Sequence, residues 1–68
     1  MKVIRITTAQ NKQVPYLFNH VMPIMTKNKC GGKFYQDSVE INAWSDKVAS
    51  AIKQALDELK IKFTEVEG

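Results

Sequence analysis

Along this 68-residue chain, segments in which apolar residues recur at every second position alternate with segments in which they recur at every third or fourth position. A spacing of two is typical of a half-buried strand, and a spacing of three or four is typical of a helix with one buried face. Residues 2–8 follow the strand pattern, with Ile4 and Ile6 on one face and Arg5 on the other. The chain is therefore expected to begin with a strand.

A helix is expected next, with Pro15 at its first position, where a missing N–H is tolerated. Its apolar stripe consists of Val14, Leu17, Phe18, Val21, Met22 and Met25, which we expect in the core. Pro23 removes a hydrogen bond from a helix interior, so a kink or an early end is expected there. Lys27 to Lys33 then forms a connection in which Gly31-Gly32 can adopt positive φ.

Residues 34–43 are rich in strand-forming side chains, and Asp37-Ser38 is a candidate tight turn. With the turn there are two strands, 33–36 and 39–43; without it, one long strand runs through. Ser45 suits a helix N-cap, and a stripe of helical spacing follows. The stripe consists of Val48, Ile52, Ala55, Leu56 and Leu59. The last alternating segment, Ile61 to Val66, predicts a final strand.

This order predicts a single domain over residues 1–68 with an α+β, ferredoxin-like βαββαβ two-layer sandwich, in which two helices cover one face of an antiparallel sheet. The alternative is βαβαβ with one long middle strand. In the ferredoxin-like order the second and last strands are the two edges of the sheet.

Several classes of protein are not favoured by this sequence. No apolar run approaches the roughly 20 residues of a membrane helix, and residues 1–8 lack the apolar core of a secretory signal. The lone Cys30 cannot form an internal disulfide, although a small secreted domain usually has one. A cytoplasmic protein with no membrane association is expected.

Catalysis and metal binding are not expected. The chain has one cysteine, Cys30, and one histidine, His20, as candidates for a nucleophile and its base. No third group is evident that would orient His20 as a base. Cys30 has no second cysteine at Cys-x-x-Cys spacing, and His20 has no neighbouring histidine. The glycine-containing segment around Gly31-Gly32 does not match a phosphate loop, because a strand follows it. We therefore expect no enzyme, cofactor or metal site.

Charge is divided unevenly along the chain. Residues 1–36 contain six basic residues and no acidic one, whereas residues 37–68 contain four lysines and seven carboxylates. This uneven distribution of charge suggests that the protein binds an anionic partner or associates with another molecule in a fixed orientation. The candidate binding residues are Arg5, Lys27, Lys29, Lys33, Tyr35, Asn42 and Trp44.

The open face of the predicted sheet is the candidate binding surface. It should carry Val3, Arg5 and Thr7 from the first strand and Glu40 and Asn42 from the third, and it can extend to Trp44. Either Phe34 or Tyr35 should lie beside them. Aromatic residues and arginine on an open sheet suit single-stranded nucleic acid, although Glu40 opposes that interpretation. We favour an Arg5–Glu40 pair across neighbouring strands, with the aromatics forming a protein-binding surface.

Trp44 precedes the predicted cap of the second helix. It is expected to pack against Val48 more than to serve as an interface anchor.

The function expected from these features is that of a non-catalytic binding protein. It would dock on a protein partner as a small regulator or inhibitor and self-associate, for example as a homodimer, through edge strands of opposite charge. The rival hypothesis is a nucleic-acid-binding module that uses the basic N-terminal half and the exposed aromatics.

Overall fold

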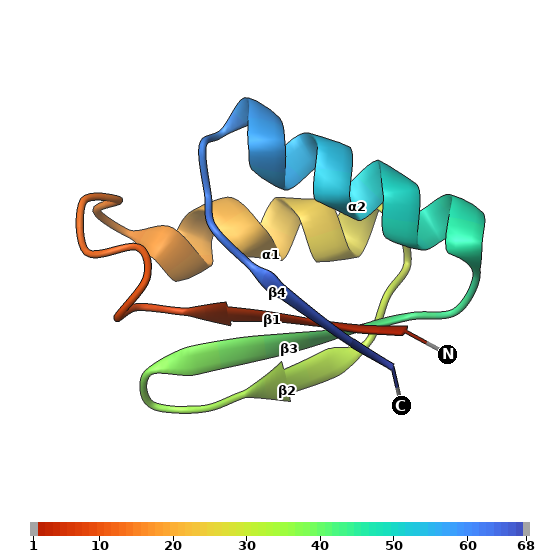
Figure 1. Cartoon of the computed structure of the whole chain (residues 1–68), viewed down its shortest axis with the longest axis horizontal. Coiled ribbons are helices and arrows are strands. Elements are labelled where there is room, and N and C mark those ends of the chain that lie inside the picture. Colours follow the sequence, from red (N-terminus) through yellow and green to blue (C-terminus); the bar gives the residue numbers. More distant parts are fainter. Residues whose placement is uncertain (1, 68) are drawn as a thin grey trace.

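The computed structural model describes residues 2–67, and Figure 1 shows a sheet with the helices together on one of its sides. The strands are β1 (Lys2–Thr7), β2 (Gly32–Phe34), β3 (Ser38–Ala43) and β4 (Thr64–Glu67), and the helices are α1 (Leu17–Lys27) and α2 (Asp46–Glu58). The Cα radius of gyration is 10.7 Å, close to the ~11 Å expected of a compact chain of this length. The predicted two-layer α+β sandwich is confirmed.

The four strands form one sheet in the order β2-β3-β1-β4, and every neighbouring pair is antiparallel. β1 and β3 are central, with Ile4 opposite Ile41 and Arg5 opposite Glu40. β2 and β4 are the edges, as expected. Among the described strands, one side of each edge strand is therefore without a neighbour in the sheet.

The connection between β2 and β3 is a tight hairpin, so the alternative of one long middle strand is wrong. The Tyr35 N–H donates to the Ser38 carbonyl at 2.8 Å, which leaves Gln36 and Asp37 as the two residues of the loop. The turn thus lies one residue earlier than expected at Asp37-Ser38. Ser38 is instead the first residue of β3, because it pairs with Thr7 of β1.

The core lies between the helices and the sheet and follows the predicted alternation. The sheet contributes five buried side chains: Ile4, Ile6, Val39, Ile41 and Ala43. The helices contribute Leu17, Val21, Ile24, Met25, Val48, Ala49, Ile52 and Leu56. Burial of a side chain such as Ile4 or Ile52 stabilises the fold by about 1.5–3 kcal/mol.

Helix α1 differs from the prediction at its first residue and at Pro23. It begins at Leu17 and not at Pro15, because Tyr16 adopts a left-handed conformation with φ of 58°. It continues through Pro23 to Lys27, with Pro23 on the exposed side. Met22, expected in the core, is 48% exposed, and Ile24 is buried. The proline therefore ends neither the helix nor its apolar stripe.

Helix α2 begins as predicted. The Ser45 hydroxyl accepts a hydrogen bond from the Val48 N–H at 3.1 Å, which satisfies one of the free donors at the helix start. Asp46 lies in the first turn, where a negative charge is favourable.

Both helices end in the same way, with a lysine in the left-handed conformation. Lys29 has φ of 54° and Lys60 has φ of 59°. The following residues complete a Schellman motif: Cys30 N–H donates to the Met25 carbonyl, and Ile61 N–H to the Leu56 carbonyl, both at 2.9 Å. Gly31 and Gly32, which were expected to be able to adopt positive φ, do not adopt it, and Lys29 provides the left-handed residue of this connection.

The second Schellman motif also explains why the last strand begins later than predicted. Ile61 is buried, but its N–H is used by the end of α2, and β4 begins only at Thr64. In residues 2–67 no helix is long and apolar enough to cross a membrane.

Candidate functional site

A hydrogen-bonded group occupies the centre of the sheet face that points away from the helices. Arg5 donates from Nη2 and Nε to the Glu40 Oε2, at 2.7 and 3.2 Å, and the Tyr35 hydroxyl donates to Oε1 at 3.1 Å. The predicted Arg5–Glu40 pair is confirmed, and Tyr35, not Phe34, is the aromatic residue beside it. Both carboxylate oxygens are therefore occupied.

These contacts determine the ionisation of Glu40. The hydrogen bonds from Arg5, and next from Tyr35, lower the pKa of its carboxyl group. Lys33 lies opposite Glu40 on β2 and lowers this pKa further through its charge. Arg5 and Tyr35 are thus engaged within the protein, which makes this face a poor stacking platform for bases.

The outer side of β2 is a second feature, and its three residues are all exposed. Asn42 N–H donates to the Gly31 carbonyl and Tyr35 N–H donates to the Ser38 carbonyl. Hydrogen-bonded pairs alternate along an antiparallel ladder, so Gly32 and Phe34 direct their backbone N–H and C=O groups away from β3. Within the described residues, no strand pairs with that side.

Side chains around this edge are both apolar and basic. Phe34 is 51% exposed on β2 itself. Lys33 is also exposed, and it takes part in none of the ion pairs between side chains of residues 2–66. We call the outward backbone groups of Gly32 and Phe34, together with the side chains of Lys33 and Phe34, the β2 edge.

Lys27, Lys29 and Trp44 lie apart from the open face, around the end of α1. The Trp44 indole N–H donates to the Asn28 carbonyl at 3.3 Å, which joins the end of β3 to the segment between the two lysines. Trp44 is 63% exposed, which does not favour the expected packing against Val48. Asn42 is half-buried on the open face, two residues along β3 from Glu40. The predicted site residues therefore form two groups.

The opposite edge, β4, is bound to the rest of the molecule by ion pairs. Glu65 accepts from Lys53 at 2.8 Å and pairs with Lys2 at 3.2 Å, and Lys2 also lies 3.6 Å from Asp46. The hydrogen bonds from Lys53 and Lys2 lower the pKa of Glu65, and the hydrogen bond to Glu65 raises the pKa of Lys2. The negative charge of Glu65 is therefore compensated by two lysines.

Cys30 and His20 do not come together. Cys30 follows α1 and is half-buried, and burial raises the pKa of its thiol, which favours the protonated form. His20 lies on the exposed side of α1. Over residues 2–67, no group of three or more His, Cys, Asp or Glu side chains is placed to hold a metal ion.

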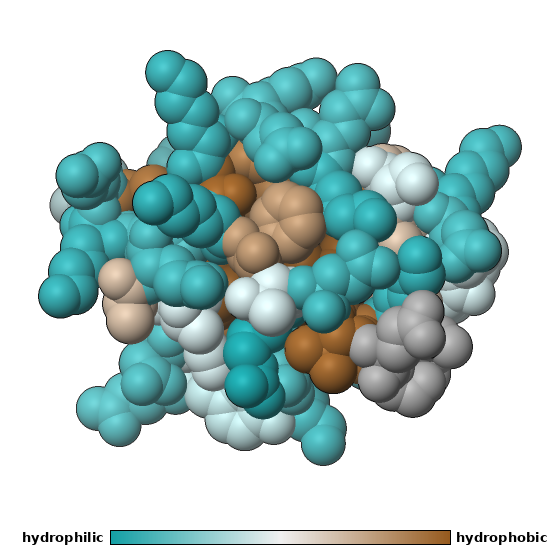
Figure 2. Space-filling view, in the orientation of Figure 1, coloured by the Kyte–Doolittle hydropathy of each residue, from teal (hydrophilic) through white to brown (hydrophobic). Residues whose placement is uncertain are grey.

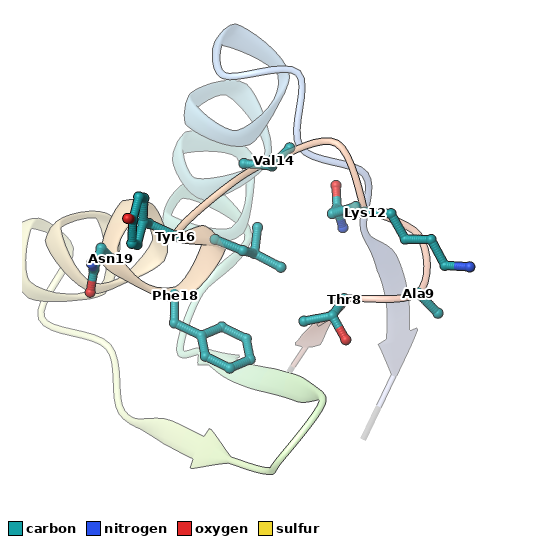
Figure 3. Close-up of a pocket in the computed structure, with 9 residues that line it drawn as sticks. Thr8, Ala9, Lys12, Val14, Tyr16, Phe18 and Asn19 are labelled. Atoms are coloured by element: carbon teal, nitrogen blue, oxygen red, sulfur yellow. The ribbon is translucent and has the colours of Figure 1, made fainter.

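Two hollows flank the loop between β1 and α1, and sequence reasoning missed both. The larger, about 710 Å³, is open and mainly apolar. Figure 3 shows Thr8, Ala9 and Lys12 on one side of it and Phe18 across from them. The smaller, about 260 Å³, lies between this loop and the α2–β4 connection, and its charged residues are Lys12, Lys60 and Lys62.

Asn11 fixes the geometry of this loop. It is the buried polar residue of the described chain, 5% exposed. Its amide group donates to the carbonyls of Thr7 and Lys62 at 2.9 Å, and its oxygen accepts from the Lys62 N–H at 2.7 Å. A polar loop gives no sequence signal for such contacts 51 residues apart.

The chain was compared with protein-family models, with curated proteins and with solved structures, and none of them matches. The functional inference therefore depends on the surfaces described above.

Proposed function

We propose that this protein is a non-catalytic binding protein that docks on a protein partner, as a small regulator or inhibitor. The partner supplies an extended segment that pairs with the β2 edge and adds a fifth strand to the sheet. The single observation that carries this proposal is the outward backbone of Gly32 and Phe34 on a fully exposed edge strand. Unpaired edge groups are a template for strand addition.

Charge indicates the chemistry of the partner segment. The chain enters β2 through a connection that carries Lys27 and Lys29, and Lys33 lies on the strand itself. All three are exposed. An acidic segment is therefore favoured, with an apolar side chain placed to contact Phe34.

Self-association remains a prediction, and the ion pairs of β4 weaken the case for it. A β2 edge that met the β4 edge of a second copy would find Glu65 already paired with Lys2 and Lys53. Two β2 edges would bring positive charges together. Sedimentation at increasing protein concentration and at two salt concentrations tests this: a monomer throughout would contradict self-association.

Two finer interpretations accompany the proposal. The element order and the edge positions of β2 and β4 support a ferredoxin-like βαββαβ domain. The single Cys30 supports a cytoplasmic location, since it offers no internal disulfide.

The experiment uses a substitution that blocks only the outer side of β2. Phe34→Pro removes an N–H that points away from β3, so the hairpin is expected to form. Phe34→Ala removes the same ring and keeps the N–H, which makes it the matched control. Both variants and the wild type are used to capture partners from extract of the producing cells, once with and once without nuclease treatment.

We expect the wild type to retain a protein partner, Phe34→Ala to retain it more weakly, and Phe34→Pro to lose it. Nuclear magnetic resonance spectra of the free variants establish that both are folded. Equal capture by folded Phe34→Pro would contradict strand addition. Loss of all retained material on nuclease treatment would instead favour the nucleic-acid hypothesis.

A further inference from the structure

We propose that the 260 Å³ hollow between the β1–α1 loop and the α2–β4 connection binds the phosphate group of a small phosphate monoester. Its charged lining residues are Lys12, Lys60 and Lys62, and no carboxylate is among the residues that line it. The other lining side chains are small, amide or apolar: Ala9, Gln10, Asn11, Gln13 and Val14. Lysine ammonium groups and amide N–H groups are donors suited to phosphate oxygens.

The three lysines are available for a ligand. Lys2, Arg5 and Lys53 all form ion pairs within the protein, whereas Lys12, Lys60 and Lys62 form none with the side chains of residues 2–66. All three are exposed. A third hollow, of about 610 Å³, adjoins the site, and Asp57 lines it together with Lys60 and Lys62. Three positive charges against one negative charge leave a net charge of +2 around the site.

The two walls of the site are held together before any ligand binds. Asn11 lies in the lining, and its side chain bonds both the N–H and the carbonyl of Lys62. The loop that carries Lys12 is thereby fixed to the connection that carries Lys62. Because the backbone of both walls is already fixed, only the lysine side chains have to become ordered when an anion binds, which lowers the entropic cost of binding.

Lys60 lies at a helix end where glycine is the usual residue, because its φ of 59° disfavours a side chain. Lys29 occupies the same position of the same motif at the end of α1, but it does not line the hollow. The two lysines therefore form a matched pair, since replacement of either by glycine removes one charge and relieves the same backbone strain.

The volume of the hollow limits the ligand. Pockets for drug-sized ligands measure about 300–1,000 Å³, so a hollow of about 260 Å³ suits one phosphate group and a small part of the molecule that carries it. The rest of the ligand would extend into the neighbouring hollow of about 610 Å³, which shares Gln10, Lys60 and Lys62 with this one. This points to a small phosphorylated metabolite, and the inference is independent of the β2 edge.

The test is a nuclear magnetic resonance titration of the full chain with glycerol 3-phosphate, and with acetate at matched ionic strength. We expect saturable amide shifts in residues 9–13 and 60–62 with the phosphate ester only. Lys60→Gly should weaken binding about tenfold, the effect of one charge-assisted hydrogen bond. Lys29→Gly should leave binding unchanged. Both variants should melt at a higher temperature than the wild type, which shows that each is folded.

Three results would overturn the proposal. The first is the absence of saturable shifts, and the second is an equal response to acetate. The third is equal weakening by Lys29→Gly and Lys60→Gly, which would assign the response to the general charge of the surface.

Discussion

At the scale of single residues, the neighbouring glycines Gly31 and Gly32 differ in whether they can accommodate a side chain. A Cβ atom at Gly32 would collide with the Glu40 carbonyl of β3 and would lie 2.9 Å from the Met25 side chain, whereas Gly31 has open space around it. The sequence identifies a Gly-Gly connection but cannot reveal this difference, which depends on the pairing of β2 with β3. By contrast, the Arg5–Glu40 pair could be predicted, because alternation alone places both on the open face.

Gly32→Ala is expected to destabilise the fold by about 1–3 kcal/mol, because the added methyl group meets backbone that cannot move freely. Gly31→Ala is the matched control and is expected to be neutral or stabilising by about 0.4–1 kcal/mol. Urea unfolding of both variants measures the difference. Similar stabilities for the two would contradict the close approach at Gly32.

The stability of the protein should depend on pH through Glu40. Its pKa is lower in the folded chain than the ordinary value of about 4.3, because Arg5 and Tyr35 donate to the carboxylate. This contribution is therefore present above pH of about 4.3 and is lost as the pH falls through the folded pKa. Glu40→Gln should reduce stability at neutral pH and show a shallower loss in acid. Parallel pH profiles of the two proteins would contradict this.

At the scale of elements, strand and helix identity could be predicted from apolar spacing, but several boundaries could not. Helix α1 continues through Pro23, since its buried residues Val21, Ile24 and Met25 hold both sides of the proline on the sheet. β4 starts late because the end of α2 uses the Ile61 N–H. In each case a tertiary contact or an end motif prevails over the local pattern.

The loop between β1 and α1 is the element that most depends on one side chain. Asn11→Ala should destabilise the protein by about 2–3 kcal/mol, since it leaves partners at Thr7 and Lys62 without their hydrogen bonds. Asn19→Ala, on the exposed side of α1, is the control and should change stability by less than about 0.5 kcal/mol. Thermal unfolding compares them, and equal melting temperatures would refute the role of Asn11.

At the scale of the whole molecule, the two sheet edges are unequal. Figure 2 shows mainly hydrophilic side chains around a small apolar area on one face. Glu65 of β4 is joined to α2 and β1 by ion pairs, whereas β2 is short and exposed and directs two residues' backbone groups outward. The charge division along the sequence predicted a basic and an acidic edge. The compensation of Glu65 could not be predicted, because it requires Lys2 and Lys53 to meet at one carboxylate.

The most direct test of the central claim is amide hydrogen exchange at Gly32 and Phe34, measured with and without the captured partner. In the free protein both amides should exchange rapidly, because no strand pairs with them. Saturation with the partner should slow both and leave Lys33, which faces β3, nearly unchanged. Fast exchange of Gly32 and Phe34 in the saturated complex would contradict strand addition at the β2 edge.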